Sequence, residues 1–156
     1  MKRALLIVDV QNDFTEGGAL PCDGGTQIAR RITEFLSNNH ETYSLIAASR
    51  DWHDSTGDNG GHFSSEPDFV DTWPPHCVAG TDGADYHPEL DISRIAVHVC
   101  KGQGRPAYSA FEGVADDGSS LADVLRDAVI DSVDIVGIAT DYCVHATARD
   151  ALELGL

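Results

Sequence analysis

The order of apolar runs along the chain is the feature that most constrains its fold. Short runs rich in aliphatic and β-branched residues, typical of buried strands, alternate with segments whose apolar residues recur at helical spacing. Strand and helix that follow one another in this way predict a parallel sheet with helices on both faces, a three-layer, Rossmann-like α/β fold. We predict strands at 3–10, 43–49, 95–100 and 133–139, and helices at 24–38, 120–129 and 143–154.

Local signals indicate where two of these helices begin and end. Ser119 or Ser120 is suited to cap the helix of residues 120–129, because a serine side chain can accept a hydrogen bond from a free N–H of the first turn. Asp141 is the expected N-cap of the last helix, and Gly155 its C-terminal stop.

The chain is expected to form one domain over residues 1–156, with an insertion at about 50–91. This insertion is rich in Gly, Asp, Ser and Pro and shows no regular periodicity. A stretch of that length inside a compact domain is usually functional. We therefore look for binding residues there.

Charge and hydropathy exclude several classes of partner. The formal net charge is −16, which would repel a phosphate backbone and argues against nucleic-acid binding. No apolar run reaches the ~18–20 residues that cross a bilayer, and no signal peptide is recognisable, so we expect a cytoplasmic protein without a membrane partner. The four cysteines are expected to be reduced thiols.

Polar residues follow each of the four predicted strands. Asp9, Asp51 and Lys101 come at or just after the first three, and Asp141 and Cys143 come after the fourth. The carboxyl ends of parallel strands meet at one edge of a sheet, and ligands bind at that edge in open α/β folds. The chain is therefore expected to carry its chemistry there.

Cys143 is the best candidate for a nucleophile. It lies at the start of a predicted helix, where free N–H groups and the helix dipole favour a thiolate. The alternative is a buried structural cysteine, the commonest role for this residue type. Cys77, beside a candidate metal ligand, is the second choice.

Asp9 and Lys101 are candidates to assist that thiol. A carboxylate at the end of a buried strand gains basicity through partial desolvation, so Asp9 would take the thiol proton. Lys101 would pair with Asp9, and the backbone N–H groups of Ala139 and Cys143 would form an oxyanion hole, in a turn where we expect a strained or cis peptide. The alternatives are a turn aspartate and a lysine that extends its charge to solvent.

A second cluster predicts a metal site. Asp51, His53, His62 and His76 fall within 26 residues. One oxygen and three nitrogen ligands suit Zn, Fe or Mn, and the absence of thiolates favours an open coordination position. The alternative is a set of surface histidines.

Three aromatic residues lie close in sequence to these candidates: Phe14, Trp73 and Tyr108. They would either sandwich a flat ring or pack in the core, and both interpretations stay open at this stage.

Five motifs together resemble the nicotinamidase/pyrazinamidase family of the isochorismatase-like (cysteine hydrolase) superfamily. The resemblance extends over residues 2–156. The motifs are VDVQNDF at 8–14, DWH at 51–53, WPPHC at 73–77, Lys101-Gly102, and IATDYCV at 138–144.

The resemblance implies an isochorismatase-like hydrolase that converts nicotinamide to nicotinate and ammonia in NAD salvage, with pyrazinamide as a further substrate. It implies a catalytic triad of Asp9, Lys101 and Cys143. It also implies one divalent metal, zinc before iron or manganese, on the Asp51 and histidine cluster. A homo-oligomer is an open alternative.

Two departures from the family accompany this resemblance. Asn59-Gly60-Gly61 reads as a small insertion between His53 and His62. Family members usually continue beyond the position of Leu156 with a strand–helix–strand portion, without which we expect an apolar strand edge to be exposed. The alternative functions are hydrolysis of another C–N substrate, such as a carbamoyl or ureido compound, and a chain without activity.

Overall fold

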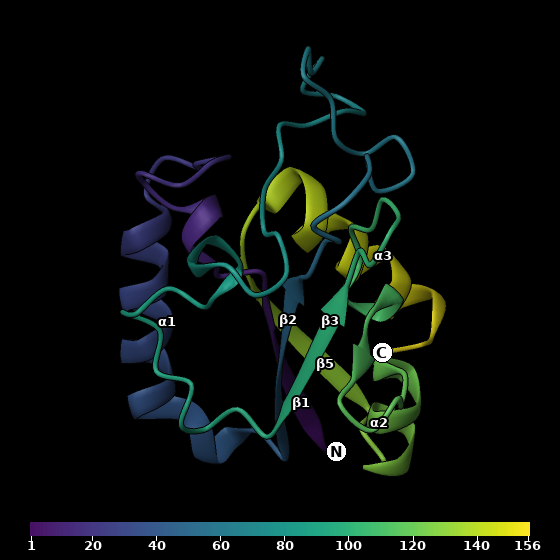
Figure 1. Ribbon diagram of the computed structural model, residues 1–156. Coiled ribbons are helices and arrows are strands. Elements are labelled where there is room, and N and C mark those ends of the chain that lie inside the picture. The colour runs from purple at the N-terminus through teal and green to yellow at the C-terminus, as the bar shows by residue number, and fades with distance from the viewer.

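The computed structural model describes residues 1–156 and contains one five-stranded sheet of order β4-β3-β2-β1-β5 (Figure 1). Strand β1 lies between β2 and β5 and is parallel to both, and β2 is parallel to β3. The strands are β1 Arg3–Val8, β2 Leu45–Asp51, β3 Val97–Lys101, β4 Val114–Ala115 and β5 Ser132–Gly137. All four predicted strands are confirmed, with ends shifted by up to two residues.

Helices cover both faces of the sheet, as the alternation predicted. Figure 1 shows α1 (Gly25–Asn39) on one side and α2 (Leu121–Asp127) and α3 (His145–Glu153) on the other. Ser120 caps α2 by accepting a hydrogen bond from the Asp123 N–H. None of the helices is both long enough and apolar enough to cross a membrane.

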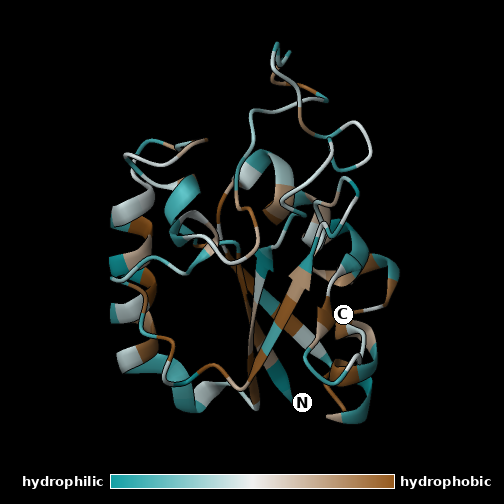
Figure 2. Cartoon of the chain, viewed as in Figure 1, coloured by the Kyte–Doolittle hydropathy of each residue, from teal (hydrophilic) through white to brown (hydrophobic).

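Two core clusters pack against opposite faces of β1, because successive side chains of a strand point to opposite sides. Leu5 and Ile7 pack with the α1 residues of one cluster, and Ala4 and Leu6 pack with the α2 residues of the other. From Ala4 to Val8 no β1 side chain exceeds 1% exposure. Figure 2 shows the strands mostly hydrophobic and the upper loops mostly hydrophilic. Strand β1 is therefore the rigid centre of the sheet, and it fixes the position of the residue after its last one, Asp9.

The sheet is not wholly parallel, which differs from the prediction. Strand β4 pairs antiparallel with β3 through Val99–Ala115 and Cys100–Val114. A two-residue strand has too little sequence to show the period-2 alternation from which strands are predicted. The prediction therefore missed it.

The connection from β5 to α3 corrects the prediction for Asp141. Residues Thr140–Val144 form a π-helical turn. Its N-cap residue is Ala139, and no side chain makes a capping hydrogen bond there. Asp141 lies inside this turn and does not cap α3, which begins at His145. The expected cis peptide is present, between Ile138 and Ala139. Gly155, with φ of 79°, follows the end of α3 as predicted.

The long segment between β2 and β3 is mostly irregular, as expected. In Figure 1 its first part lies over the carboxyl edge of the sheet, and its last part runs down past α1 to the start of β3. Two isolated β-bridges connect residues within this segment, His53 with Val78 and Phe63 with Trp73. Short helical turns complete the chain at Asn12–Phe14, His40–Thr42, Asp82–Ala84 and Ala110–Glu112.

Strand β5 forms the edge of the sheet beyond β1, and each of its residues is half-buried.

Candidate active site

The carboxyl ends of three strands and one turn bring the predicted polar residues together. Asp9 follows β1, Asp51 ends β2 and Lys101 ends β3, and all three are at most 2% exposed. Cys143 reaches the same place from the π-helical turn after β5 and is 7% exposed. Four segments that are distant in sequence thus form one buried cluster.

Lys101 is the centre of this cluster. Its Nζ lies 2.9 Å from Asp9 Oδ2, and it donates to Asp51 Oδ1 at 2.5 Å and to Cys143 Sγ at 3.7 Å. The pairing with Asp9 was expected from the sequence. The contact with Asp51 was not, and it joins the nucleophile candidate to the metal-ligand candidates through one ammonium group.

The charges of the cluster follow from burial and pairing. Burial alone would lower the pKa of Lys101, but Asp51 and Asp9 hold it well above its usual range. Burial alone would raise the pKa of Asp51, but the Lys101 ammonium holds it well below its usual range. Burial outweighs Lys101 at Asp9, so the pKa of that carboxyl is raised. Asp9 is therefore the more basic of the two carboxylates.

The state of Cys143 differs from the expectation drawn from a helix N-terminus. Burial raises the pKa of its thiol well above the usual range, although the Lys101 charge acts against this. Cys143 does lie in a first helical turn, since the π-helical turn of Thr140–Val144 runs directly into α3, yet burial is the largest influence on the pKa of its thiol. Cys143 is a thiol at rest and needs a base, and Asp9 is the adjacent basic group.

The three histidines that were predicted as metal ligands converge. His53, His62 and His76 are each at most 2% exposed, and one ligand atom from each lies within 4.8 Å of the others. Asp51 Oδ2 adds a carboxylate oxygen 3.5 Å from His53 Nε2 and 3.6 Å from His76 Nε2. The structure therefore brings together all four predicted ligands, and these residues can hold a divalent metal.

The hydrogen bonds around the rings fit metal binding. Nδ1 of His53 lies 2.7 Å from the Gly102 carbonyl oxygen, and Nδ1 of His76 lies 2.7 Å from that of Pro74. Each Nδ1 then carries the proton, and each Nε2 has a free lone pair. Nε2 of His53 and Nδ1 of His62 are buried with no hydrogen-bond partner. Buried nitrogens without a partner are costly unless a ligand satisfies them.

His62 is placed by the segment that resembled an insertion. Asn59 is 3% exposed, and its Oδ1 accepts hydrogen bonds from the N–H groups of Asp54 and Gly104. Its carbonyl oxygen accepts one from the His62 N–H. Burial lowers the pKa of His62 to about 4, so its ring is neutral and able to bind a cation.

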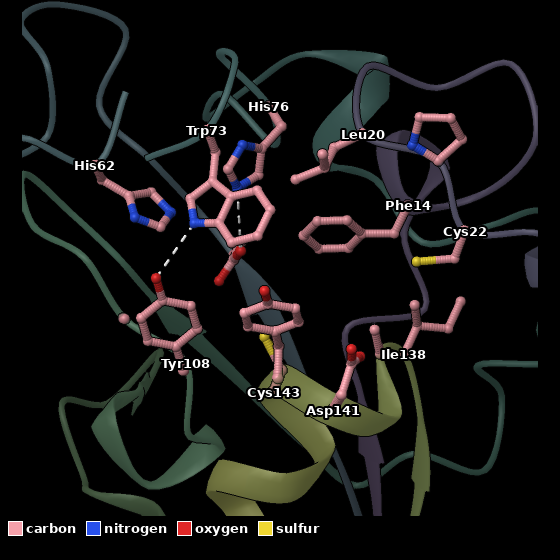
Figure 3. A pocket seen from close by; sticks show the side chains of 15 residues that line it. Phe14, Leu20, Cys22, His62, Trp73, His76, Tyr108, Ile138, Asp141 and Cys143 are labelled. Carbon is pink, nitrogen blue, oxygen red and sulfur yellow. Dashed lines mark hydrogen bonds and ion pairs between the residues drawn. The ribbon is translucent and has the colours of Figure 1, made fainter. Parts of the chain in front are cut away.

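A cavity of about 260 Å³ opens beside both clusters (Figure 3). Phe14, Trp73 and Tyr108, the aromatic residues considered from the sequence, all line it, which places them at the site. In Figure 3, His62 and His76 enter from the upper loop while Cys143 approaches from below. Trp73 Nε1 donates to the Tyr108 hydroxyl at 3.2 Å, so these two rings hold each other in place.

Phe14, Trp73, Tyr108 and Tyr142 together form an aromatic wall of the cavity, and of these Tyr142 was not predicted from the sequence. Its ring meets Trp73 edge-on at 5.0 Å and stacks on Tyr108 at 6.2 Å. Its position next to Cys143 was the available signal. Asp141, which the sequence placed at this edge, also lines the cavity. Five further residues line it without having been predicted to do so: Leu20, Pro21, Cys22, Ala107 and Ile138.

The remaining predictions concern the oxyanion hole and the second-choice nucleophile. The Ala139 N–H, considered for an oxyanion hole, makes no hydrogen bond within the protein. Cys77, the second choice for a nucleophile, is fully buried, with Sγ 4.0 Å from the Gly83 carbonyl oxygen and outside the cavity lining. His98, which was not among the predicted ligands, bonds the Tyr86 hydroxyl away from the site.

A parallel sheet core covered on both faces, with a polar cluster and a cavity at its carboxyl edge, defines an α/β enzyme of the Rossmann-like class. Residues 3–156 match the Isochorismatase domain family, and the chain belongs to that family.

Known proteins agree with this assignment. The chain is 51% identical to the nicotinamidase/pyrazinamidase of Mycobacterium tuberculosis over 99% of its own length and 81% of that protein. It superposes on the pyrazinamidase of Pyrococcus horikoshii in complex with zinc with a TM-score of 0.83 and 40% identity, covering 100% of this chain and 81% of the other.

A second structure, PnC1 from L. infantum in complex with nicotinate, has a TM-score of 0.83 and 35% identity, covering 99% of this chain and 76% of the other. These findings confirm the resemblance drawn from the motifs and the expectation of an amidohydrolase.

Proposed function

We propose that this protein is a metal-dependent cysteine amidohydrolase that converts nicotinamide to nicotinate and ammonia, with pyrazinamide as a further substrate. The observation that carries the proposal is a buried thiol next to a basic carboxylate at the floor of an aromatic cavity. The relatives named above, which are nicotinamidases and pyrazinamidases, support the same substrate class.

Asp9 begins the reaction by taking the Cys143 proton. Lys101, which contacts both groups, stabilises the negative charge first on Asp9 and then on the thiolate. The thiolate attacks the carboxamide carbon, and the carbonyl electron pair moves to oxygen, where the N–H groups of Ala139 and Cys143 donate to it. The C–N bond then breaks, Asp9 returns its proton to nitrogen, and ammonia leaves a thioester on Cys143. Water adds to the thioester with Asp9 as base, and C–S cleavage releases the carboxylic acid product.

The aromatic wall explains how a flat ring would be held. Phe14 lies on one side of the cavity and Trp73 on another, and both are within reach of a pyridine bound above Cys143 (Figure 3). Offset or edge-on contacts between such rings add about 0.5–1.5 kcal/mol each beyond burial. These contacts position the amide against the sulfur without any charged anchor.

Asp51, His53, His62 and His76 would hold the metal, and we propose zinc. Three neutral nitrogens and one carboxylate are ligands that zinc accepts at catalytic sites, and the Pyrococcus horikoshii relative is a zinc complex. A bound ion would supply a Lewis acid beside the cavity, able to accept the lone pair of a pyridine nitrogen. The protein's own part is to orient the rings of His53 and His76 through their Nδ1 contacts and to keep the ring of His62 neutral.

We further propose that residues 1–156 form a single hydrolase domain with a metal-binding insertion at about 50–91, acting in the cytoplasm on a small-molecule substrate. The position of His53, His62 and His76 on one irregular segment supports the insertion. The rest of the site comes from strand ends and the turn before α3.

Ammonia release from nicotinamide by zinc-loaded protein tests the proposal. The C143A variant should lose at least about 10³-fold in kcat, on the order of what nucleophile removal costs other hydrolases. C100A, whose thiol lies on β3 outside the cavity, is the matched control and should keep wild-type activity. A folded, zinc-loaded wild type that leaves nicotinamide intact but hydrolyses a ureido substrate would support the alternative function instead.

A further inference from the structure

The Ser49 hydroxyl makes one hydrogen bond, and its partner is Asp9. Ser49 lies on β2 next to Ala47 and Ala48 and is 1% exposed. Its Oγ donates to Asp9 Oδ1 at 2.7 Å, and it does not line the cavity. Packing alone would be satisfied by a third alanine on this strand. The hydroxyl therefore needs an explanation in terms of Asp9.

The backbone of Ser49 holds Asp9 as well. Asp9 has φ of 51°, in the left-handed region that is unfavourable for a non-glycine residue. Its N–H donates to the Ser49 carbonyl oxygen at 3.1 Å, and the two strands are in register at Val8 and Ser49. Ser49 thus binds Asp9 through both its main chain and its side chain at the point where β1 ends.

These contacts make the two carboxylate oxygens of Asp9 unequal. Oδ1 is occupied by the Ser49 hydroxyl. Oδ2 faces Lys101 as an ion pair at 2.9 Å but accepts no hydrogen bond of good geometry. Lys101 in turn contacts Cys143 Sγ. The oxygen with free acceptor capacity is therefore the one on the side of the thiol.

We propose that Ser49 is a positioning residue that fixes the Asp9 carboxylate so that Oδ2 receives the Cys143 proton. The S–H bond breaks, the proton moves to Oδ2, and the electron pair stays on sulfur as the nucleophile. The same proton later leaves Oδ2 with the amine nitrogen. Without the Ser49 hydroxyl the carboxylate can rotate about its Cβ–Cγ bond, and either oxygen can turn toward Lys101.

The inference rests on the proposed function, and its first readout is kinetic. In S49A, kcat for ammonia release from nicotinamide should fall about 10–100-fold, since a hydrogen bond to a charged group contributes about 1.5–3 kcal/mol. KM should stay within about twofold of wild type, because Ser49 does not touch the cavity. S49T keeps the hydroxyl and should restore most of kcat. S49C, a weak donor of similar size, should fall between them.

The second readout needs no substrate. The alkylation rate of Cys143 by iodoacetamide, followed by site-resolved mass spectrometry, should be lower in S49A than in wild type. Cys22, a half-exposed thiol in the same cavity, is the internal reference and should react at an unchanged rate. If wild type releases no ammonia from nicotinamide, the proposed function fails, and this readout still tests Ser49.

The matched control is S132A, since Ser132 Oγ is buried without a partner at the far end of β5. It should leave kcat and Cys143 alkylation unchanged. The inference is overturned if S49A, folded by thermal melting and loaded with zinc, keeps wild-type kcat and Cys143 reactivity. It is also overturned if S49T loses as much kcat as S49A while remaining folded.

Discussion

The backbone of Gly102 lies directly against the imidazole of His53. Its carbonyl oxygen is 2.7 Å from Nδ1, and a Cβ built on its Cα would be 2.5 Å from Cε1 of the ring. Gly102 also has φ of 86°, which side chains rarely tolerate. The turn after β3 therefore supports a metal ligand that comes from a different segment of the chain.

We predict that G102A weakens zinc binding at least about 10-fold, because the methyl group displaces the His53 ring and disturbs its Nδ1 hydrogen bond. Loss of the partners that orient metal ligands typically costs about 10–100-fold in affinity. Competition with a chromophoric chelator measures this directly.

G118A is the control for the G102A experiment. Gly118 has φ of 84° but nothing within 4 Å of an added Cβ, so it reports backbone strain without a clash. Zinc affinity in G118A should equal that of wild type. Equal affinities in G102A and wild type would show that His53 does not depend on this contact.

Chelation of the metal should lower the melting temperature of the protein. Nε2 of His53 and Nδ1 of His62 are buried without a partner in the protein, and a ligand that binds only the folded state stabilises that state. At free zinc about 100 times Kd the gain is about 2.7 kcal/mol. Thermal melting with EDTA and after zinc is restored measures the difference.

The H53A variant should lose the response of the melting temperature to zinc, whereas H98A should keep it. His98 is half-buried and bonded to the Tyr86 hydroxyl, away from the cluster. A zinc-dependent shift of wild-type size in H53A would remove His53 from the ligand set.

Asn59 should be needed for the order of the loop between the first two histidine ligands. Its buried side chain makes three hydrogen bonds, two to Asp54 and one to Gly104. We predict that N59A costs about 1–3 kcal/mol of unfolding free energy and weakens zinc binding, because His62 loses its support. Urea unfolding and zinc titration measure the two effects.

N38A is the matched control for N59A, since Asn38 is exposed on α1 and bonds only the Glu34 carbonyl oxygen. It should change the unfolding free energy by less than about 0.5 kcal/mol and leave zinc binding intact. If N59A bound zinc as wild type does, the loop would be held by other contacts.

Strand ends were the part of the site that sequence could predict. Asp9, Asp51 and Lys101 each follow an apolar run, and parallel strands must deliver such residues to one edge. The same logic predicted α1, α2 and the layers around them. Such predictions require only the periodicity of apolar residues and the direction in which each strand runs.

Contacts between residues of different loops could not be predicted in this way. The Lys101–Asp51 pair depends on how far β2 and β3 are offset, which no local pattern encodes. Tyr142 belongs to the aromatic wall only because a π-helical turn rotates it toward Trp73. Asn59 looked like part of a small insertion, yet its side chain accepts a hydrogen bond from Gly104 in the turn after β3, 45 residues away in sequence.

The stability of the protein should depend on Glu16 in acid. Its Oε1 accepts from the Gly24 N–H at 2.6 Å and its Oε2 from the Thr26 N–H at 2.8 Å, so this carboxylate caps the start of α1. Hydrogen bonds from Thr26 and Gly24 lower the pKa of Glu16 from 4.5 to about 2. A folded-state pKa below the unfolded one stabilises the protein above pH 4.5, and this stabilisation is lost as pH falls toward 2.

E16Q should therefore have a lower urea midpoint than wild type at about pH 7, and the gap should narrow between pH 4.5 and pH 2. E34Q is the control, because the Glu34 carboxylate lies exposed on α1 and accepts no hydrogen bond. Its midpoint should follow that of wild type at every pH. A gap between E16Q and wild type that stays constant from about pH 7 to about pH 3 would mean that the Glu16 charge does not stabilise α1, because only the charged form accepts both N–H bonds at full strength.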